Sequence, residues 1–413
     1  MTELPGLKFK GPLTHPVLGV DVSAMVQRSF DLLLENEFYG IDPGSYYSQN
    51  LRRFHSNGNS LINRAWNKGF HTLVALGGAY TTKVFALPNI TSTKAAALTL
   101  SGLASLRAKP EICDPSELET TAKALIDWLV DRRNDDAGAW TPDFQYEIRG
   151  TAIPADVLGT INTVFCCEAL WQWRDKFEAV DELIITAAKA CLRYLPRHET
   201  DTECCFSYNP STRYFVHNAN LFVALLLARA SFLDPDLLSE EAIVEKCVRY
   251  TLNDFDKAGA LRYAGPPTIN NTVDNYHTGF VIRTMKELLP FIEDGVLAVR
   301  MQEQIDDGLR DYSNLFIKYH GIPKFSNSAH QIHAHSVAEA LLVFSEFRNQ
   351  FKSLDKERLS FGVERSIEIL WNSQYQWFDS EALVIGGFCF WRNSSPMPRW
   401  AWAWLFTALV RSL

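Results

Sequence analysis

Residues 270–280 read NNTVDNYHTGF and gather hydrogen-bonding side chains directly before an apolar segment. Asp274 and His277 are three residues apart, so both side chains share one face if a helix begins here. Such a pair orients an imidazole for proton transfer. Asp274 fits equally well as a helix N-cap that accepts the backbone N–H of His277. The two roles are compatible, and the spacing predicts an aspartate–histidine pair at the start of a helix near 275–291.

Three further histidines stand at comparable points in the chain. His217 lies in FVHNANLF, where a structural histidine with satisfied hydrogen bonds and a functional one are equally good interpretations. His333 and His335 are two residues apart, which puts them on different helix faces, and we expect His333 to point inward. Several histidines could instead bind zinc. A zinc site needs ligands that are closer together in the sequence than these histidines, and no HExxH motif is present. We therefore expect no metal and no other cofactor.

Two kinds of helical segment alternate from residue 90 onward. Segments such as LDKERLSFGVERSIEIL are amphipathic and expose one face to water, whereas segments such as NLFVALLLARASFL are apolar all round and must be buried on every side. The alternation predicts inner helices near 93–108, 157–175, 217–232, 275–291, 333–349 and 397–412. Outer helices are predicted near 116–133, 179–195, 239–255, 295–317 and 355–373, with a sixth somewhere within 21–80.

The pairs of inner and outer helices recur about every 60 residues. Six pairs can close into an all-α (α/α)6 toroid, a single domain without an apolar end that needs capping. An open solenoid is the alternative, but the apolar C-terminal segment RWAWAWLFTALV has no polar cap after it, which favours closure. We assign the toroid to residues 61–413. Residues 1–60 are expected to form an N-terminal helix and a long loop packed on it.

A closed ring would gather the candidate residues at one mouth, because the outer helices carry the chain back and every inner helix then starts at the same end. Helix N-termini favour anionic or hydroxyl-bearing ligands there. The candidates for catalysis are Asp274, His277, His217, His333 and Asp156. The candidates for substrate binding are Arg399, Asn218, Asn220, Asn275, Tyr263, Tyr276, Trp140 and Tyr208. Lys94 also falls at this mouth, whereas Glu168, Glu287 and Glu346 lie further along their helices and are expected to be structural.

The reaction stays open between hydrolysis, elimination and epimerisation. A glycosidase needs two carboxylates about 5–10 Å apart, and Asp156 and Asp274 are the best pair. A histidine-rich site with Tyr263 or Tyr276 fits proton abstraction beside a uronate carboxyl just as well, with Arg399 neutralising that carboxyl. A salt bridge from Arg399 to Asp274 or Asp156 is the structural alternative. A non-catalytic glycan-binding or assembly subunit with the same toroid is the alternative outside enzymology.

The composition limits the partners of the chain. Its 413 residues carry a formal net charge of −8 without a Lys/Arg-rich tract, which argues against nucleic acid. No run of 18 uncharged apolar residues is present, so we expect no integral membrane span. The N-terminal segment lacks the apolar core of a signal peptide, which favours a cytoplasmic protein. The eight cysteines lack zinc or redox spacing and are expected to be small buried hydrophobes.

Several segments resemble a family of proteins from bacterial exopolysaccharide and O-antigen gene clusters, which includes VpsJ-type polysaccharide biosynthesis proteins. Many members carry the label delta-aminolevulinic acid dehydratase, which does not fit, because that enzyme is an α/β barrel and nothing here alternates strands with helices. The resemblance runs from about residue 38 to the end and is carried by YGIDPGSYYS, TSTKAAALTLSGL, HNANLFVALLLAR, DNYHTGFVI, GIPKFS, IHAHSVAEALL and RWAWAWLFTAL. It implies an α/α toroid that works in the cytoplasm on a cell-surface glycan or on its oligosaccharide or polysaccharide precursor. The oligomeric state stays open.

Overall fold

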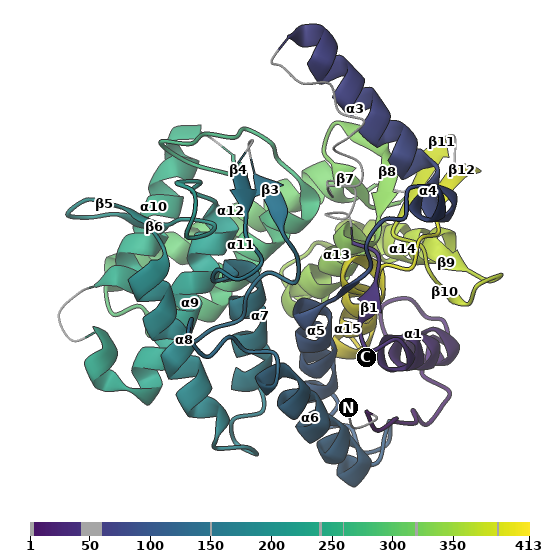
Figure 1. The fold of residues 1–413 in the computed structure, drawn as a ribbon, viewed down its shortest axis with the longest axis horizontal. Helices are drawn as coiled ribbons and strands as arrows, with labels where there is room; N and C mark the ends of the chain where they lie inside the picture. Colours follow the sequence, from purple (N-terminus) through teal and green to yellow (C-terminus); the bar gives the residue numbers. More distant parts are fainter. Residues whose placement is uncertain are drawn as a thin grey trace.

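The computed structural model describes residues 4–42, 60–148, 151–238, 242–258, 260–318, 321–385 and 388–413. Its inner helices stand around a common centre (Figure 1). They are α5 (Thr93–Ala104), α7 (Thr160–Trp171), α9 (His217–Leu233), α11 (Asn275–Leu288), α13 (Ala334–Phe347) and α15 (Ala403–Arg411), the last preceded by a π-helical turn (Pro398–Trp402). Each inner helix packs against the next, and α15 packs against α5. The ring is therefore closed, and the predicted (α/α)6 toroid is confirmed.

An outer helix covers each inner helix. These outer helices are α6 (Pro115–Val130), α8 (Val180–Tyr194), α10 (Ile243–Ala258), α12 (Gly295–Phe316), α14 (Ser353–Leu370) and α1 (Ser23–Glu35). Because α1 packs against α15, it fills the sixth outer position. The ring thus includes part of the segment that we had assigned to an N-terminal addition. Residues 43–59 of the segment predicted to form a helix and a long loop lie outside the described residues.

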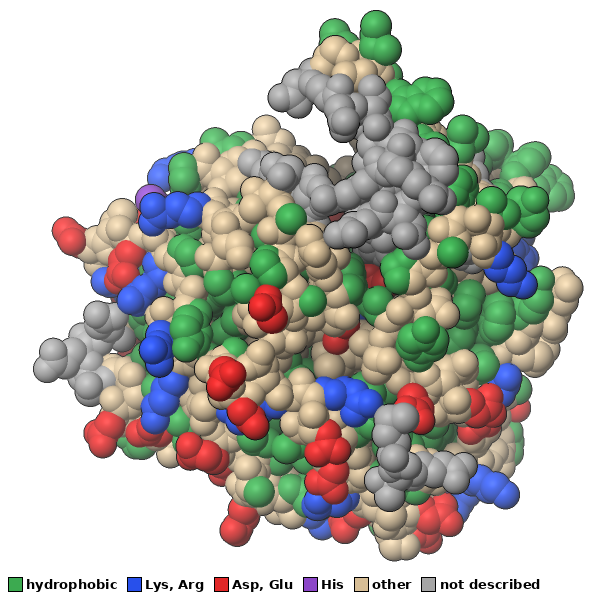
Figure 2. Space-filling view, in the orientation of Figure 1, with side chains coloured by type: hydrophobic (Ala, Val, Ile, Leu, Met, Phe, Trp, Pro, Cys, Tyr) green, Lys and Arg blue, Asp and Glu red, His purple; other side chains and the backbone are tan. Residues whose placement is uncertain are grey.

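Two helices lie outside the ring, although they fall within the residues assigned to it. They are α3 (Leu61–Leu76) and α4 (Gly78–Val84), and α3 projects from the body of the molecule (Figure 1). Figure 2 shows exposed hydrophobic side chains near these helices, and on the rest of this face acidic and basic side chains are interspersed. No helix among the described residues is both long and apolar enough to cross a membrane.

Short strands lie within the connections that lead from outer helices to inner helices. They form the hairpins β3 (Tyr146–Ile148) with β4 (Thr151–Ile153), β5 (Arg197–Glu199) with β6 (Cys204–Phe206), and β9 (Trp371–Asn372) with β10 (Trp377–Phe378); β1 (Tyr39–Gly40) pairs with β2 (Ile90–Thr91). A four-stranded sheet has the order β12 (Phe388–Asn393), β11 (Glu381–Ile385), β8 (Ser328–His333) and β7 (Pro323–Phe325).

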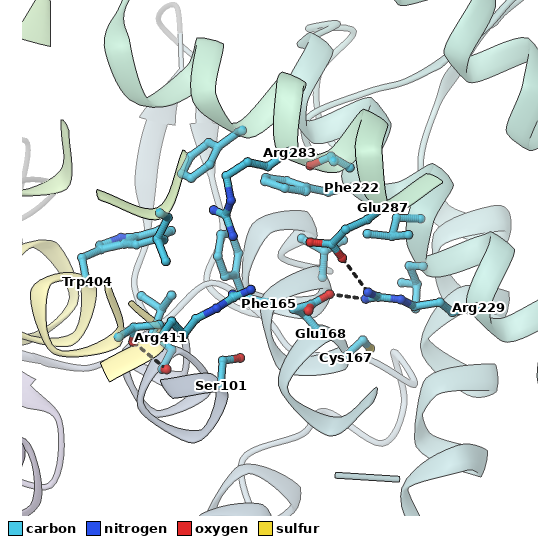
Figure 3. A pocket seen from close by; sticks show the side chains of 18 of the residues that line it. Ser101, Phe165, Cys167, Glu168, Phe222, Arg229, Arg283, Glu287, Trp404 and Arg411 are labelled. Atoms are coloured by element: carbon cyan, nitrogen blue, oxygen red, sulfur yellow. Dashed lines mark hydrogen bonds and ion pairs between the residues drawn. The ribbon is translucent and has the colours of Figure 1, made fainter. Parts of the chain in front are cut away.

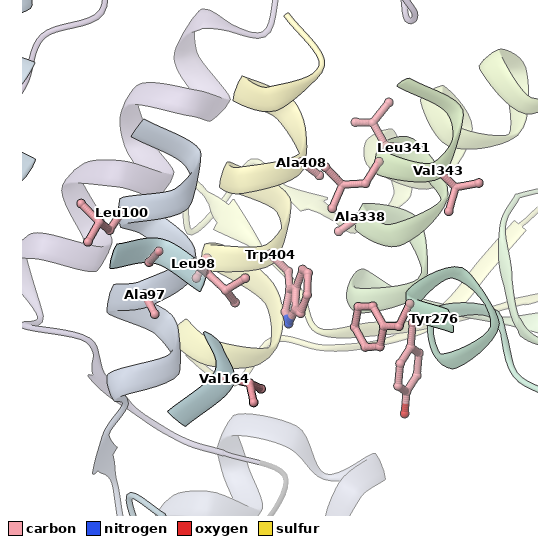
Figure 4. Packing of buried hydrophobic residues seen from close by; sticks show 14 of the residues in the cluster. Ala97, Leu98, Leu100, Val164, Tyr276, Ala338, Leu341, Val343, Trp404 and Ala408 are labelled. Carbon is pink, nitrogen blue, oxygen red and sulfur yellow. The ribbon is translucent and has the colours of Figure 1, made fainter. Parts of the chain in front are cut away.

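Small residues allow the inner helices to approach closely. A Cβ atom on Gly279 of α11 would lie 2.5 Å from Cγ of Glu339 on α13, and one on Gly102 of α5 would lie 3.0 Å from the Phe406 ring of α15. Figure 4 shows the alanines and leucines of α5, α13 and α15 that fill the space between these helices. Close contact between the inner helices fixes where their first and last turns lie.

Four aromatic rings close the centre of the toroid. Phe165, Phe222, Phe280 and Trp404 come from α7, α9, α11 and α15 and form a circuit whose neighbouring ring centroids are 5.4–5.6 Å apart. Offset and edge-to-face contacts at this spacing are favourable. We call these four residues the aromatic layer. It separates the first turns of the inner helices from their last turns.

On the C-terminal side of the layer, arginines pair with glutamates of neighbouring inner helices around a cavity of about 70 Å³ (Figure 3). Arg229 of α9 pairs with Glu168 of α7 and with Glu287 of α11. Arg283 of α11 pairs with Glu339 and Glu346 of α13, and Arg411 of α15 also reaches Glu346. Helix C-termini carry partial negative charge, so the arginines also neutralise the converging helix ends. The three glutamates that we expected to be structural all belong to this network.

Replacing Arg229 by methionine should leave Glu168 and Glu287 without their shared cation. Because all three side chains are mostly buried, we expect the free energy of unfolding to fall by about 2–3 kcal/mol, as measured by urea denaturation. Arg310→Gln is the matched control, since Arg310 pairs with Asp307 on an exposed face, and it should cost less than about 0.5 kcal/mol. Equal losses in the two variants would contradict a stabilising network.

The buried carboxyl of Glu339 should make stability depend on pH. Burial raises its pKa from 4.5 to about 7, against the opposing effect of Arg283. Between these two pH values the folded protein keeps a proton that the unfolded chain has lost, so the contribution of Glu339 to stability falls as the pH rises. Relative to Glu339→Gln, the parent protein should lose on the order of 2 kcal/mol of unfolding free energy from pH 4.5 to pH 7. A constant difference between the two proteins, measured by urea denaturation across this range, would contradict the raised pKa.

Candidate active site

At the start of α11, Asp274 is at once the helix cap and the partner of His277. Its Oδ1 accepts the backbone N–H of His277 at 3.0 Å, and its Oδ2 lies 2.6 Å from His277 Nδ1. Because an ionised carboxylate only accepts hydrogen bonds, Nδ1 carries the hydrogen and Nε2 keeps its lone pair. Nε2 has no hydrogen-bond partner among the described residues, and the His277 side chain is 20% exposed. The pair can therefore present a base to a ligand.

The ring of Tyr276 joins this pair to a second imidazole. Tyr276 lies 4.2 Å from His277 and stacks on His335 of α13 at 4.3 Å with an interplanar angle of 10°. His335 in turn lies 4.3 Å from Trp404 of the aromatic layer. Both ring nitrogens of His335 are buried, and neither has a hydrogen-bond partner among the described residues. Burial lowers the pKa of His335 well below its ordinary value, so the ring stays neutral.

His335, not His333, stands over the aromatic layer. His333 is the N-cap of α13, where its Nε2 accepts the indole N–H of Trp400 at 2.6 Å. The helical spacing rule fails for this pair, because β8 ends at His333 and the helix begins one residue later. Both imidazoles consequently lie near Tyr276, with His333 at 6.2 Å from it. The expectation that only His333 points inward was wrong.

Lys94 enters the same region from the first turn of α5. Its Nζ lies 4.1 Å from the ring centroid of Phe165 and 5.1 Å from that of Trp404, so the amine stands over the aromatic layer. It makes no hydrogen bond or ion pair with any described residue. Burial lowers the pKa of Lys94 well below its ordinary value. The sequence predicts Lys94 at the mouth but indicates no role for it.

Arg399 forms the salt bridge that we had considered, but with a different partner. Its guanidinium binds Asp42 through two hydrogen bonds, of which the one from Nη2 to Oδ1 is 2.7 Å long. Asp42 is fully buried, and although burial alone lowers the pKa of Arg399, this carboxylate raises it. The guanidinium is thus already engaged by a carboxylate of the protein itself.

The carboxylate that the loop before α7 supplies is Asp143, not Asp156. Asp143 accepts hydrogen bonds from the backbone N–H and hydroxyl of Thr93 and from the amide of Asn162. Burial raises its pKa. Asp156 is exposed in a turn before α7, so the predicted pair of Asp156 with Asp274 is not formed.

Four other candidates face away from the centre. His217 binds Asp254 and Thr251 of the outer helix α10, at 2.9 and 3.3 Å. The remaining three are also held within the fold: Asn220 bonds to Phe206, Cys204 and Cys247, Asn275 Oδ1 accepts from Tyr312, and the buried Trp140 donates to Leu129. The Nδ2 group of Asn275 is buried and has no partner among the described residues. These hydrogen bonds turn the four side chains toward outer elements of the fold, which corrects their assignment to the site.

Three candidates remain near the mouth or within the inner ring. The Tyr263 ring lies 4.3 Å from His277 and so borders the pair. Tyr208 lies further along the same row of tyrosines, reaching Tyr263 through Tyr214. Asn218, in the first turn of α9, is buried with its Oδ1 unpartnered by any described residue. These polar groups are available to a ligand.

The described residues contain no cluster of three or more histidine, cysteine, aspartate or glutamate side chains arranged to hold a metal ion. The chemistry that the site offers from its own residues is acid–base chemistry. One imidazole has a free lone pair and a fixed tautomer, and a second is neutral and unsatisfied. An apolar aromatic surface lies beside the second imidazole, and a buried amine stands over the same surface.

Comparisons with known proteins bear on the fold. No protein-family model and no curated protein matches the sequence. Among solved structures, it is similar to a sugar epimerase from a ruminal bacterium (TM-score 0.58, 10% identity, 78% of this chain and 87% of that one). It is also similar to cellobiose 2-epimerase from Bacillus thermoamylovorans (0.58, 9%, 78% and 87%) and to a possible GH105 member from Salmonella enterica (0.52, 12%, 88% and 97%). At these identities the likeness establishes the fold alone.

In Asp274→Asn, the side chain should no longer fix which ring nitrogen of His277 carries the hydrogen, and the helix should stay folded. Asparagine is also a good N-cap, so the free energy of unfolding should change by less than about 1 kcal/mol. An amide can donate as well as accept, so the imidazole should become a mixture of the two tautomers. Nitrogen-15 NMR of the histidine ring measures this directly. A parent protein that already carries its hydrogen on Nε2 would contradict the arrangement.

Proposed function

We propose that this protein is a sugar epimerase or isomerase, which moves a proton at a carbon atom next to a carbonyl. One observation carries the proposal: Tyr276 contacts two imidazoles, His277 with a free Nε2 and His335 with two unsatisfied nitrogens. The His277 ring lies 4.2 Å and the His335 ring 4.3 Å from the Tyr276 ring, so the two imidazoles are close to each other. A sugar-sized reactant can therefore touch both.

The carboxylates near the mouth favour proton transfer at carbon over hydrolysis. A glycosidase needs one carboxyl group as an acid and a second as a base or nucleophile. Asp274 is held by His277, Asp42 by Arg399, and Asp143 by Thr93 and Asn162. Each of these carboxylates is thus committed to positioning another group. The imidazoles are the groups left with unused nitrogens.

The reaction begins with an open-chain sugar whose carbonyl lies beside the carbon that reacts. His277 Nε2 takes the proton from that carbon, and the electron pair moves onto the carbonyl oxygen to give an enediolate. Asp274 stabilises the imidazolium that forms. The neutral His335 then gives its N–H proton to the same carbon from the other face, which yields the epimer; it regains a proton from water while the imidazolium of His277 releases its own, so both rings end neutral. In the isomer, His277 instead returns its proton to the neighbouring carbon while a hydroxyl proton of the enediolate is lost and the oxygen of the original carbonyl is protonated. The aromatic layer keeps bulk water from the reacting carbon on its side of the centre.

We place this reaction in the making of a bacterial cell-surface polysaccharide, with a glycan or its precursor as substrate. The resemblance of segments such as DNYHTGFVI and HNANLFVALLLAR to proteins of exopolysaccharide and O-antigen gene clusters supports that context. The similar structures described as a sugar epimerase and a cellobiose 2-epimerase have the same fold, which agrees with this class of substrate.

Proton transfer predicts exchange with solvent. Incubating the protein with a panel of reducing sugars in D₂O should replace hydrogen at the carbon next to the carbonyl by deuterium, as followed by NMR. His277→Ala and His335→Phe should each slow the exchange by about 10²–10⁴-fold, because each removes one acid–base group. The phenylalanine keeps the stacking on Tyr276.

His330→Gln, at an exposed position on β8, is the control for the loss of a histidine and should exchange at the parent rate. Release of new reducing ends without deuterium incorporation would overturn the proposal in favour of hydrolysis. Sugar binding without any turnover would favour a non-catalytic subunit.

A further inference from the structure

The amine of Lys94 is buried without an anionic partner. The residue is 4% exposed, and among the described residues its Nζ contacts the faces of Phe165 and Trp404 but no acceptor oxygen. Cation–π contacts compensate only part of the loss of hydration of an ammonium group. Buried charged groups in proteins are normally paired, so an unpaired one calls for an explanation.

The acidic side chains around Lys94 are engaged elsewhere. Glu339 pairs with Arg283, Asp42 with Arg399, and Asp143 with the first turn of α5. These carboxylates influence Lys94 through space, but none forms an ion pair with it. The place of a contacting anion is therefore open to a ligand.

We propose that Lys94 binds a carboxylate of the substrate, so that the site takes an acidic sugar such as a uronate; this rests on the proposed function. Lys94 and His335 both contact the ring of Trp404. A sugar lying on the aromatic layer can therefore place its reacting end at the imidazole and its carboxylate at the amine. The sequence alone favoured Arg399 for this role, but that guanidinium is held by Asp42.

The charge of the site favours a carboxylate over a phosphate. Lys94 is the cation at the aromatic layer without a carboxylate partner among the described residues, whereas a phosphate monoester carries nearly two negative charges at neutral pH. One ammonium matches one carboxylate. Binding should also raise the lowered pKa of Lys94, because a nearby negative charge favours the protonated amine. An acidic sugar should therefore bind with uptake of a proton, and its neutral analogue should not.

The test measures binding of three matched pairs by calorimetry: glucose with glucuronate, galactose with galacturonate, and mannose with mannuronate. In the parent protein at least one acid should bind ten-fold or more tightly than its neutral partner. Lys94→Met should abolish that preference while leaving the affinity for the neutral sugar within two-fold. Lys94→Arg, which keeps the charge, should retain a preference. Circular dichroism and thermal melting check that each variant is folded.

Repeating the titrations in two buffers of different ionisation enthalpy gives a second readout. Proton uptake should accompany the acid in the parent protein and be absent in Lys94→Met. A preference for the acid that survives in Lys94→Met, or no preference for any acid, would overturn the proposal. An adduct on Lys94 that borohydride traps with a neutral sugar would overturn it as well, since it would assign the amine a covalent role.

The calorimetric result is separate from that of the exchange experiment. Acid preference that depends on Lys94 without deuterium exchange would leave the carboxylate site standing and remove the epimerase proposal. Deuterium exchange on neutral sugars, together with equal affinity for acidic and neutral sugars, would leave the epimerase proposal standing and remove the carboxylate site. Arg310→Gln, on the exposed face of α12, is the control for a change of charge far from the site.

Discussion

The contact between α15 and α5 is the interaction on which the rest of the structure depends. It joins the last inner helix to the first and turns a row of helix pairs into a ring. Once the ring is closed, the first turns of all inner helices lie at one end, and their last turns lie at the other. Side chains as far apart in the sequence as Lys94, His277, His335 and Trp404 then become neighbours, although none of them is near another along the chain.

Closure also sorts charge along the axis of the ring. Helix N-termini carry partial positive charge, and the carboxylates of Asp274 and Asp143 accept backbone N–H groups there. Helix C-termini carry partial negative charge, and there Arg229, Arg283 and Arg411 pair with four glutamates around the small cavity. The aromatic layer separates the two ends. The well-defined cavity at the C-terminal end is thus lined by charges that satisfy one another, whereas the N-terminal end keeps unsatisfied donors and acceptors.

The sequence predicted the inner helices well because a helix that is apolar on every side has one possible place in a soluble ring. It also predicted the Asp274–His277 pair, since both residues lie within one helical turn. It failed where direction depends on how a helix is rotated about its own axis: His217 and Asn275 start inner helices but bond to the outer helices α10 and α12. The partnership of Arg399 with Asp42 joins residues 357 positions apart, and no local pattern reveals it.

One physical cause underlies the two most unusual groups near the mouth. The aromatic layer and the surrounding inner helices exclude water from His335 and Lys94, and this burial lowers the pKa of both. Neutral imidazole has the free lone pair that can take a proton from carbon, and a protonated amine deprived of water binds an anion more strongly than a hydrated one. A fold that only needed stability would be better served by an apolar residue at either position, because each leaves a polar group unsatisfied. Their contact with the ring of one tryptophan, Trp404, is therefore the strongest reason to regard this end of the ring as the site of chemistry.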